Sequence, residues 1–490
     1  MSRLFIAFAI AYFLAGCAVG PDYREPKMAV PKQWSGADSR AKTAQPDKWW
    51  QAFGDKELDR LITEAIAANL DLKLALERVK DARAQRSATI AAGLPSIDAK
   101  NTVSRRFNNS SGGQQTGGGV GGGFGFGSQH INIFQLGFDA QWELDFFGGV
   151  RRAVEAADAT IDSEVENSRD VLVTLLGDVA RNYIELRSNQ RQVEITQKNL
   201  AAQRDTQGLT EIRQQSGLAS MLDVAQAQAQ ADTTEAQLPN YEALVKQSIH
   251  ALSVLLGREP AALSARLERQ ATIPAGAVVI IPDLPSELLK RRPDIRYAER
   301  QMAYANASIG VATAELYPKV NLAAFLGLQN MTITDFTPLG KSWSAASTIT
   351  MPIFNWGKLN ANIKSKKAQF EQSFLTYQST VLTAFQEVED ALIAYSKEQQ
   401  RHKSLAQAVA ANQLAVELAT ERYQKGLTGF IDVLQTQQAL YQSESLLVAS
   451  DAKISSNLVA LYKALGGGWQ TEARVGDALK AKKFPMGLGG

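Results

Sequence analysis

The stretch RYQKGLTGFIDVLQTQQAL, residues 422–440, decides the fold because the chain contains it twice. It has the pattern of a helix end, a tight turn at Gly426 and a second helix start. Residues 213–228, RQQSGLASMLDVAQAQ, match it at a constant offset of 209 (422 − 213). The matched pairs are Arg213/Arg422, Gly217/Gly426, Leu218/Leu427, Asp223/Asp432, Val224/Val433, Gln226/Gln435 and Gln228/Gln437. An offset held over roughly eighty residues indicates an internal duplication, which predicts two equivalent helical hairpins.

Upstream of the hairpins the two copies match at a different offset, 223 (318 − 95). The matched pairs there are Asp71/Asp294, Ala75/Ala298, Ala82/Ala305, Ala91/Ala314 and Pro95/Pro318. The first copy therefore contains 14 extra residues (223 − 209), and the glycine-rich run 110–127 is the natural insertion. No Gly-Lys-Ser/Thr follows that run, so a flexible surface loop is favoured over a phosphate-binding loop.

Composition excludes several classes of function. The 490 residues carry a net charge of +2, which argues against a nucleic-acid partner. One cysteine allows no intramolecular disulfide, and one cysteine with three histidines argues against a zinc site. No serine or cysteine pairs with a histidine in a motif, so we expect no enzyme and no cofactor; a hydrolase barrel is the enzymatic alternative. Beyond residue 16, no stretch is apolar over the ~20 residues that a membrane-spanning helix needs.

Residues 1–16 have the basic start and apolar core of a secretory signal peptide. The residues Leu14-Ala15-Gly16-Cys17 resemble the bacterial lipobox, which implies cleavage before Cys17 and a covalent lipid on its thiol. A plain signal peptide followed by a chance cysteine is the alternative. Ala18 is not the aspartate that would suggest retention at the inner membrane. The Pro-rich residues that follow are expected to be extended.

The period changes to two in FQLGFDAQWELDF, residues 134–146. Apolar residues alternate with polar and acidic ones over 13 residues, more than the ~9–11 of a tilted transmembrane strand. Apolar-out and acidic-in is the pattern of a transmembrane barrel; an amphipathic strand in a soluble sandwich is the alternative. Three weaker strands are expected at 97–103, 320–326 and 343–353.

Helical spacing predicts helices over 55–93, 150–206, 218–256, 286–316, 358–421 and 430–465. In the second of these, apolar residues recur with heptad spacing, which predicts a coiled-coil seam. They are Leu172, Leu176, Val179, Tyr183, Leu186, Val193 and Leu200.

Four strands per chain cannot close into a barrel, and open sheet edges are not tolerated in lipid. Small barrels begin at about eight strands. The chain must therefore oligomerise, giving 8 strands from two copies or 12 from three. Polar lumen-facing residues and long amphipathic helices favour the wider ring. The expected fold class is an α+β membrane protein with a twofold internal repeat.

Several motifs together resemble the outer-membrane factor lipoproteins of Gram-negative tripartite efflux pumps. They are WELDFFGG, LPSELLKRRPDI, NASIGVATAELYPKV, MPIFNWGKL, TAFQEVEDAL, RYQKGLTGFIDVLQTQ and LVALYKALGGGW. The resemblance implies a homotrimer with a 12-stranded outer-membrane β-barrel, four strands per chain, a 12-helix periplasmic α-barrel and a mixed equatorial domain. The implied segments are a lipidated segment 17–54 packing on the equatorial region, repeat one 55–256, a connector 257–283, repeat two 284–470 and a tail 471–490.

The resemblance also implies functional residues at the two turns. The implied periplasmic gate residues are Tyr423, Ile431, Asp432, Gln435 and Asp223. The implied adaptor-contact turns contain Arg213, Gly217, Leu218, Arg422, Gly426 and Leu427. Helix capping is the alternative for both aspartates, and a glycine C-cap with an apolar leucine staple is the alternative for the turns. Thr428 stands where some relatives have arginine, which argues against a salt bridge there.

The implied function is export of drugs or other small toxic molecules through the outer membrane, opened by untwisting of the hairpins. The implied partners are outer-membrane lipid, a periplasmic adaptor and an inner-membrane pump, often of the resistance-nodulation-division class. A type I secretion channel and a metal-efflux channel are alternatives. The lipobox favours efflux over secretion, and the termini lack the His- or Met-rich tracts that would favour metal export.

Overall fold

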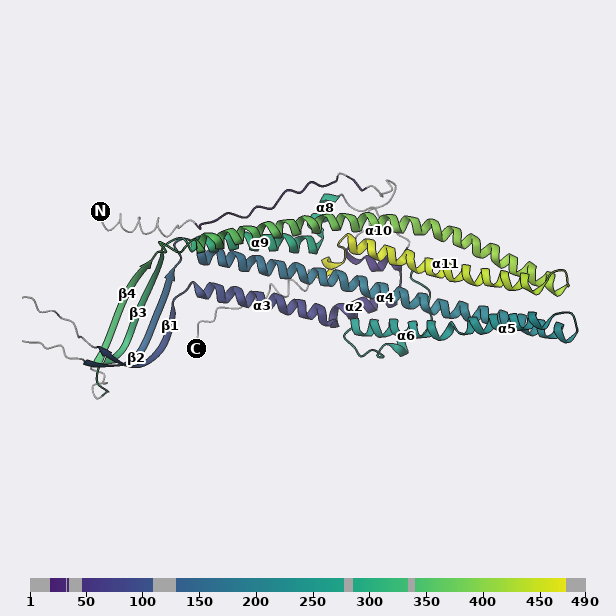
Figure 1. Cartoon of the computed structure of the whole chain (residues 1–490), viewed down its shortest axis with the longest axis horizontal. Helices are drawn as coiled ribbons and strands as arrows, with labels where there is room; N and C mark the ends of the chain where they lie inside the picture. The colour runs from purple at the N-terminus through teal and green to yellow at the C-terminus, as the bar shows by residue number, and fades with distance from the viewer. Residues whose placement is uncertain are drawn as a thin grey trace, which may run out of the picture. The chain divides into compact units, whose positions relative to one another are not determined.

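The computed structural model describes residues 18–31, 33–34, 46–108, 129–276, 285–333 and 340–472 of the chain (Figure 1). Cys17, the glycine-rich run 110–127 and most of the tail 471–490 lie outside the described residues, so their assignments stay predictions. The chain divides into two compact units. Unit 1 contains Met1–Glu25, Lys80–Ile161 and Arg300–Phe374, and unit 2 contains Pro26–Val79, Asp162–Glu299 and Leu375–Gly490. Each unit thus combines segments of both sequence repeats.

Unit 1 contains one antiparallel sheet in the order β1-β2-β3-β4 (Figure 1). Its strands are β1 Ser96–Asn108, β2 Gln129–Leu144, β3 Lys319–Asn330 and β4 Lys341–Thr350. All four expected strands are therefore present. β2 ends two residues before Phe146 because the Asp145 carboxylate accepts a hydrogen bond from the Arg151 backbone N–H (3.0 Å), at the start of the next helix.

The strand register confirms the duplication. Ser96 pairs with Gln141 in β1–β2, and Lys319 pairs with Thr350 in β3–β4. The second pair is the first pair moved by the two sequence offsets (96 + 223 = 319 and 141 + 209 = 350). β1 is therefore equivalent to β3, and β2 to β4.

The two faces of the sheet differ as the alternation predicts. Phe138 pairs with Leu326, which pairs in turn with Trp343, so these exposed apolar side chains form a row across three strands. On the other face Lys100 forms an ion pair with Asp139 at 3.3 Å. An apolar outer row and a charged inner face fit a membrane strand better than a soluble sandwich core.

The segment after Cys17 packs in unit 1. The Val19 N–H donates to the Phe147 carbonyl (3.1 Å), and the Arg152 guanidinium donates to the Val19 carbonyl (3.1 Å). A Cβ on Gly148 would lie only 2.6 Å from the Cα of Ala18. Ala18 is therefore fixed just beyond the end of β2.

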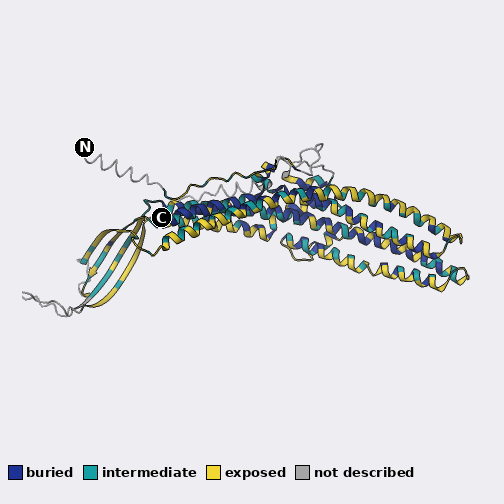
Figure 2. Cartoon of the chain, turned by 45° about the horizontal axis from the view of Figure 1, so that its top comes forward, coloured by how far each residue is buried: buried dark blue, intermediate teal, exposed yellow. Residues whose placement is uncertain are grey.

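The helices have the following bounds: η1 Pro46–Phe53, α2 Lys56–Ala68, α3 Leu70–Ala92, α4 Gly149–Gln215, α5 Met221–Glu235, α6 Leu238–Leu255, α7 Ser264–Leu267, α8 Pro285–Arg291, α9 Pro293–Ala314, α10 Lys358–Gln424, α11 Phe430–Ala464 and η4 Trp469–Glu472. No helix in the described ranges is both long and apolar enough to cross a membrane. In unit 2 the seven predicted heptad residues of α4 are all buried, and buried residues follow the inner sides of the helices (Figure 2). Trp49 of η1 stacks on Tyr462 of α11 with ring centroids 5.2 Å apart.

Three predicted helices are each two helices. The helix expected at 55–93 breaks at Asn69, whose side chain accepts from the Leu72 N–H (2.9 Å) and donates to the Leu255 carbonyl (2.9 Å). The one expected at 218–256 begins only at Met221 and breaks after Glu235, where Pro239 occupies the first turn of α6. The one expected at 286–316 breaks before Pro293.

Candidate functional site

The two duplicated turns lie in unit 2 and have the same backbone geometry. Gly217 has φ +73° and Gly426 has φ +72°, a region that favours glycine. The Leu218 N–H donates to the Arg213 carbonyl (2.8 Å), and the Leu427 N–H donates to the Arg422 carbonyl (2.9 Å). These bonds end helices α4 and α10, so the glycine C-caps are confirmed.

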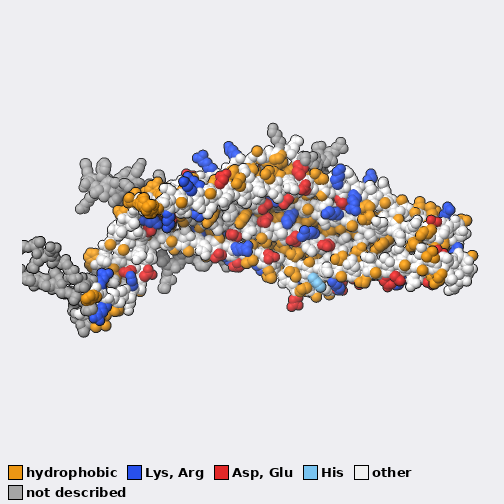
Figure 3. Space-filling model, in the orientation of Figure 1, with side chains coloured by type: hydrophobic (Ala, Val, Ile, Leu, Met, Phe, Trp, Pro, Cys, Tyr) orange, Lys and Arg blue, Asp and Glu red, His pale blue; other side chains and the backbone are white. Residues whose placement is uncertain are grey.

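The leucines at these turns are largely exposed. Leu218 is 67% exposed and Leu427 is 65% exposed, so most of each side chain faces solvent. Met221 and Leu222, at the start of α5, are also largely exposed. The turns thus display apolar side chains, which suits protein contact. Hydrophobic side chains are also scattered over the rest of the visible face (Figure 3).

The helix starts after the turns differ between the copies. Ser220 and Asp223 form a capping box: the Asp223 N–H donates to the Ser220 hydroxyl (3.2 Å), and the Ser220 N–H donates to the Asp223 carboxylate (2.9 Å). The capping interpretation of Asp223 is confirmed. In the second copy Gly429 replaces the serine, and no side chain caps α11. The exposed Asp432 carboxylate accepts from the Thr428 hydroxyl instead, so the capping interpretation of Asp432 is wrong.

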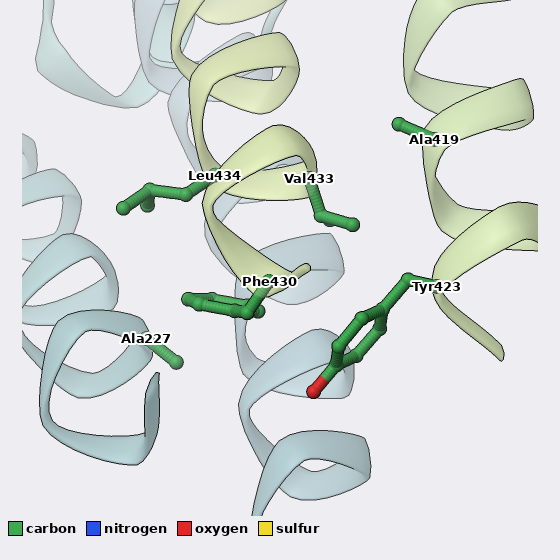
Figure 4. Close-up of a cluster of buried hydrophobic side chains, with 6 residues drawn as sticks. All are labelled: Ala227, Ala419, Tyr423, Phe430, Val433 and Leu434. Carbon is green, nitrogen blue, oxygen red and sulfur yellow. The ribbon is translucent and has the colours of Figure 1, made fainter. Parts of the chain in front are cut away.

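Tyr423 is buried between the two hairpins, with 3% of its surface exposed. Its ring meets Phe430 edge to face at 5.8 Å (Figure 4). Ala227, Ala419, Val433 and Leu434 complete this cluster, and Phe430 lies between Ala227 and Tyr423 (Figure 4). The cluster joins residues of α5, α10 and α11.

Two residues of α4 also contact Tyr423. The phenol forms a long hydrogen bond of 3.5 Å with the Thr210 hydroxyl. The Arg213 guanidinium lies 4.7 Å from the Tyr423 ring centroid and donates to the Gln424 carbonyl at 3.1 Å. Arg213, at the end of the first hairpin's long helix, therefore binds the end of the second hairpin's long helix. Its sequence equivalent Arg422 is exposed, so the two arginines play different structural parts.

Farther from the turn, a row of polar side chains on α4 lies along the second hairpin. We name it the polar seam: Gln192, Thr196, Asn199, Gln203, Thr206 and Thr210, all buried. Four of its members bond to α11. Gln192 donates to the Ser445 carbonyl (2.9 Å), Thr196 contacts the Tyr441 hydroxyl (3.3 Å), Asn199 donates to Glu444 (2.7 Å), and Thr206 accepts from Gln437 (2.9 Å).

Sequence reasoning missed the polar seam, although its signal was present. The members are spaced four and three residues apart, as the buried leucines of the same helix are. Polar residues at such positions usually face water, so the spacing alone does not predict their burial. The side-chain nitrogen and oxygen of Gln203 are both buried without a hydrogen-bond partner among the described residues, a situation that costs about 1–3 kcal/mol.

Three predicted gate residues share an exposed side of α11. Ile431, Asp432 and Gln435 are exposed and lie within about one turn of the helix, whereas their neighbours Phe430 and Val433 are buried. Asp223 and Tyr423 are not on this surface, because one caps α5 and the other is buried. The five predicted gate residues therefore do not form one site: three lie on the exposed side of α11, one caps α5 and one lies in the contact between the hairpins.

A charged cavity of about 610 Å³ lies elsewhere in unit 2. Its lining includes the buried Arg292, which bonds Asp294 (2.6 Å) and Glu387 (2.7 Å). Burial raises the pKa of the Asp170 carboxyl above its usual range, and the negative charge of Asp294 adds to the effect. No cluster in the described ranges has three or more side chains suited to a metal ion.

The exposed turns, the hydrogen-bonded hairpins and the amphipathic sheet are the features expected of an oligomeric membrane channel. A family model described as "Outer membrane efflux protein" matches residues 61–258 and 284–467, and the chain belongs to that family. Its members are channels and not enzymes.

The chain is 32% identical to the probable efflux pump outer membrane protein TtgC of Pseudomonas putida, over 99% of this chain and 100% of the relative. It is 31% identical to nodulation protein T of Rhizobium leguminosarum, over 94% and 93%. The solved outer-membrane channel OprN superposes with a TM-score of 0.84 at 31% identity, over 93% of this chain and 100% of that one. The expected fold class and the function of an outer-membrane efflux channel are confirmed.

Proposed function

We propose that three copies of this chain form a channel through which an inner-membrane pump expels drugs or other small toxic molecules, with a periplasmic adaptor docked on the exposed turns. The hydrogen-bonded contact between the hairpins carries the proposal. Arg213, Thr210 and the polar seam bind the second hairpin to the first by groups that water can replace. Such a contact is specific when made and inexpensive to break, which suits a gate.

Opening would then be a movement of α10 and α11 away from α4 near the turns. Ile431, Asp432 and Gln435 would line the constriction, because they form the exposed side of α11. Three copies of Asp432 around a narrow axis would repel one another and attract cations. The apolar Leu218 and Leu427 would receive the adaptor, and adaptor binding would favour the open state by binding it more tightly.

A lipid on Cys17 fits the position of the next residue. Ala18 lies beside Gly148, just beyond the end of β2. Because adjacent Cα atoms are about 3.8 Å apart, acyl chains on Cys17 would begin close to the end of the sheet. We therefore propose a lipid-anchored channel whose sheet lies in the outer membrane and whose hairpins extend into the periplasm.

Complementation of a drug-sensitive Gram-negative strain that lacks its own channel tests the proposal, with the pump and adaptor supplied. The wild-type chain should restore resistance. Leu218→Asp combined with Leu427→Asp should abolish resistance without lowering the amount of assembled protein. Leu74→Asp, a change at another exposed leucine of unit 2, is the matched control and should have no effect. Resistance that survives the double change would contradict adaptor docking at the turns.

A Cys17→Ser variant tests the anchor separately. Metabolic labelling with palmitate should mark the wild-type chain and leave the variant unlabelled. Equal labelling of both would overturn the lipid assignment without touching the channel proposal.

A further inference from the structure

The edges of the sheet carry large apolar side chains. Within the described sheet β1 and β4 each have one neighbouring strand. Val103 on β1 and Trp343 on β4 are largely exposed, as are Ile97 near the start of β1 and Ile353 just after β4. The internal repeat determines what covers these edges.

The pairing of β2 with β3 is the junction between copy one and copy two of the repeat. In a closed ring, the next junction joins copy two of one chain to copy one of the next chain, that is, β4 to β1. Because β4 is equivalent to β2 and β1 to β3, the same pairing geometry applies at both junctions. The register at the junction between chains then follows from the two offsets.

In the ring assembly, β4 pairs antiparallel with β1 of a second copy of this chain. We propose that in this pairing Ser347 lies opposite Val103. This pair is the Phe138–Leu326 pair of β2–β3 moved by the offsets (138 + 209 = 347 and 326 − 223 = 103). The same operation places Trp343 opposite Phe107, from Phe134–Asn330. This register rests on the ring assembly of the proposed function.

The chemistry of the paired edges agrees with this register. The Leu144–Val320 pair at the end of β2–β3 becomes Ile353 opposite Ile97. Both isoleucines are exposed in the single chain, at 84% and 70%. The register also keeps Val103 and Trp343 on the apolar face that Phe138 and Leu326 define, whereas a shift of one residue would turn one of them to the charged face.

A contact beyond the strand ends extends the same junction. Within the chain, the Phe147 ring after β2 stacks on the Tyr317 ring before β3, with centroids 4.7 Å apart. The offsets convert this pair into Trp356 and Leu94 of the second copy (147 + 209 = 356 and 317 − 223 = 94). Trp356 is 91% exposed and Leu94 is 58% exposed.

The turns that carry these aromatic residues are also equivalent. Gly148 and Gly357 follow Phe147 and Trp356 and have φ +77° and +79°. Trp356 itself has φ +53°, a left-handed conformation that is strained for a residue with a side chain. Packing of its indole on Leu94 of the second copy would offset that strain and close the ring at the base of the strands.

Cysteine pairs test the register in the full-length protein in detergent, with a mild oxidant and a short bismaleimide. Ser347→Cys with Val103→Cys should give covalent dimers and trimers in denaturing gels. The same-face neighbours, Ser347→Cys with Asn101→Cys or with Arg105→Cys, should give at least severalfold less. Val103→Cys with Phe134→Cys, a pair within one chain, should cross-link without an increase in mass. Ser347→Cys alone controls for reaction with Cys17.

Trp356→Cys with Leu94→Cys tests the second contact, and Phe147→Cys with Tyr317→Cys is its control within one chain. Light scattering of the untreated variants reports assembly independently. An assembled protein that cross-links best through Asn101 or Arg105, or through no pair, would overturn the register and leave the channel proposal intact. A monomeric protein would overturn both.

Discussion

Replacing Arg213 with alanine should make the isolated channel conduct without its partners. The wild-type guanidinium lies 4.7 Å from the Tyr423 ring centroid and bonds the Gln424 carbonyl at 3.1 Å. Both contacts join α4 to α10, so movement of the second hairpin breaks them. The alanine variant loses them in the closed state and loses nothing in the open state.

The magnitude follows from the two contacts. A cation over an aromatic ring contributes about 0.5–2 kcal/mol, and a hydrogen bond to a charged donor contributes about 1.5–3 kcal/mol. The guanidinium is partly exposed, so the lower values apply, and water replaces the lost donor at the Gln424 carbonyl. A closed state weakened by about 2 kcal/mol per chain raises the open-to-closed ratio of each chain roughly 30-fold, since about 1.4 kcal/mol is tenfold. If the three hairpins of a channel open together, the three effects multiply to a rise on the order of 10⁴-fold.

Single-channel recording in planar bilayers measures this ratio as an open probability. Arg213→Lys keeps the charge near the ring but loses the planar fork, so its open probability should lie between those of wild type and Arg213→Ala. Arg422→Ala is the matched control, because Arg422 has the equivalent sequence position and is exposed. Unchanged open probability in Arg213→Ala, or an equal rise in Arg422→Ala, would refute the role given to this contact.

Four further outcomes are expected. Asp432→Ala should change conductance and cation block in bilayers without changing thermal stability, whereas Asp223→Ala should lower stability by about 1 kcal/mol through the lost helix cap and leave cation block unchanged. Gly426→Val should abolish drug resistance because a β-branched residue is strained at φ +72° and distorts the turn. The amount of trimer should hold, since the turn is exposed and a Cβ there is 3.9 Å from its nearest neighbour; loss of trimer would instead mean a folding role. Gln203→Leu should raise the melting temperature and lower the open probability, because it removes an unpaired buried amide; a lower melting temperature would speak against the unpaired state. The raised pKa of Asp170 means that its ionised form destabilises the fold. The stability that this group contributes is therefore present below about pH 4 and is lost as the pH rises through the raised pKa. Asp170→Asn should melt higher than wild type at pH 7, and the difference should vanish near pH 4.

The sequence predicted most of the fold because two of its signals are geometric. Strict alternation at 134–146 identified a strand, and a constant offset identified the duplication that the register of Ser96 and Lys319 later confirmed. The helix breaks at Asn69 and before Pro293 were missed, since apolar spacing continues across each of them. Local capping and proline chemistry, not hydrophobic period, decides where those helices end.

The candidate site was harder to predict because its residues pair across the two hairpins. Tyr423 and Arg213 lie 210 positions apart (423 − 213), and nothing local in the sequence joins them. The polar seam was missed for a related reason. Gln192, Thr196 and Thr206 are buried against partners on α11, which only tertiary structure supplies. Arg213 and Arg422 occupy equivalent positions in the sequence, but Arg213 is half-buried and Arg422 is exposed.

The threonines of the polar seam have a kinetic consequence. Thr196, Thr206 and Thr210 each already donate to a carbonyl one turn back in α4, at 2.7, 2.8 and 2.8 Å. Their hydroxyl hydrogens stay bonded when the second hairpin departs, so the amide, carboxylate and tyrosine hydroxyl groups are the ones that must find water. Hydration of a few such groups would then limit the speed of hairpin movement, which would make the rate sensitive to water activity and to osmolytes around the hairpins.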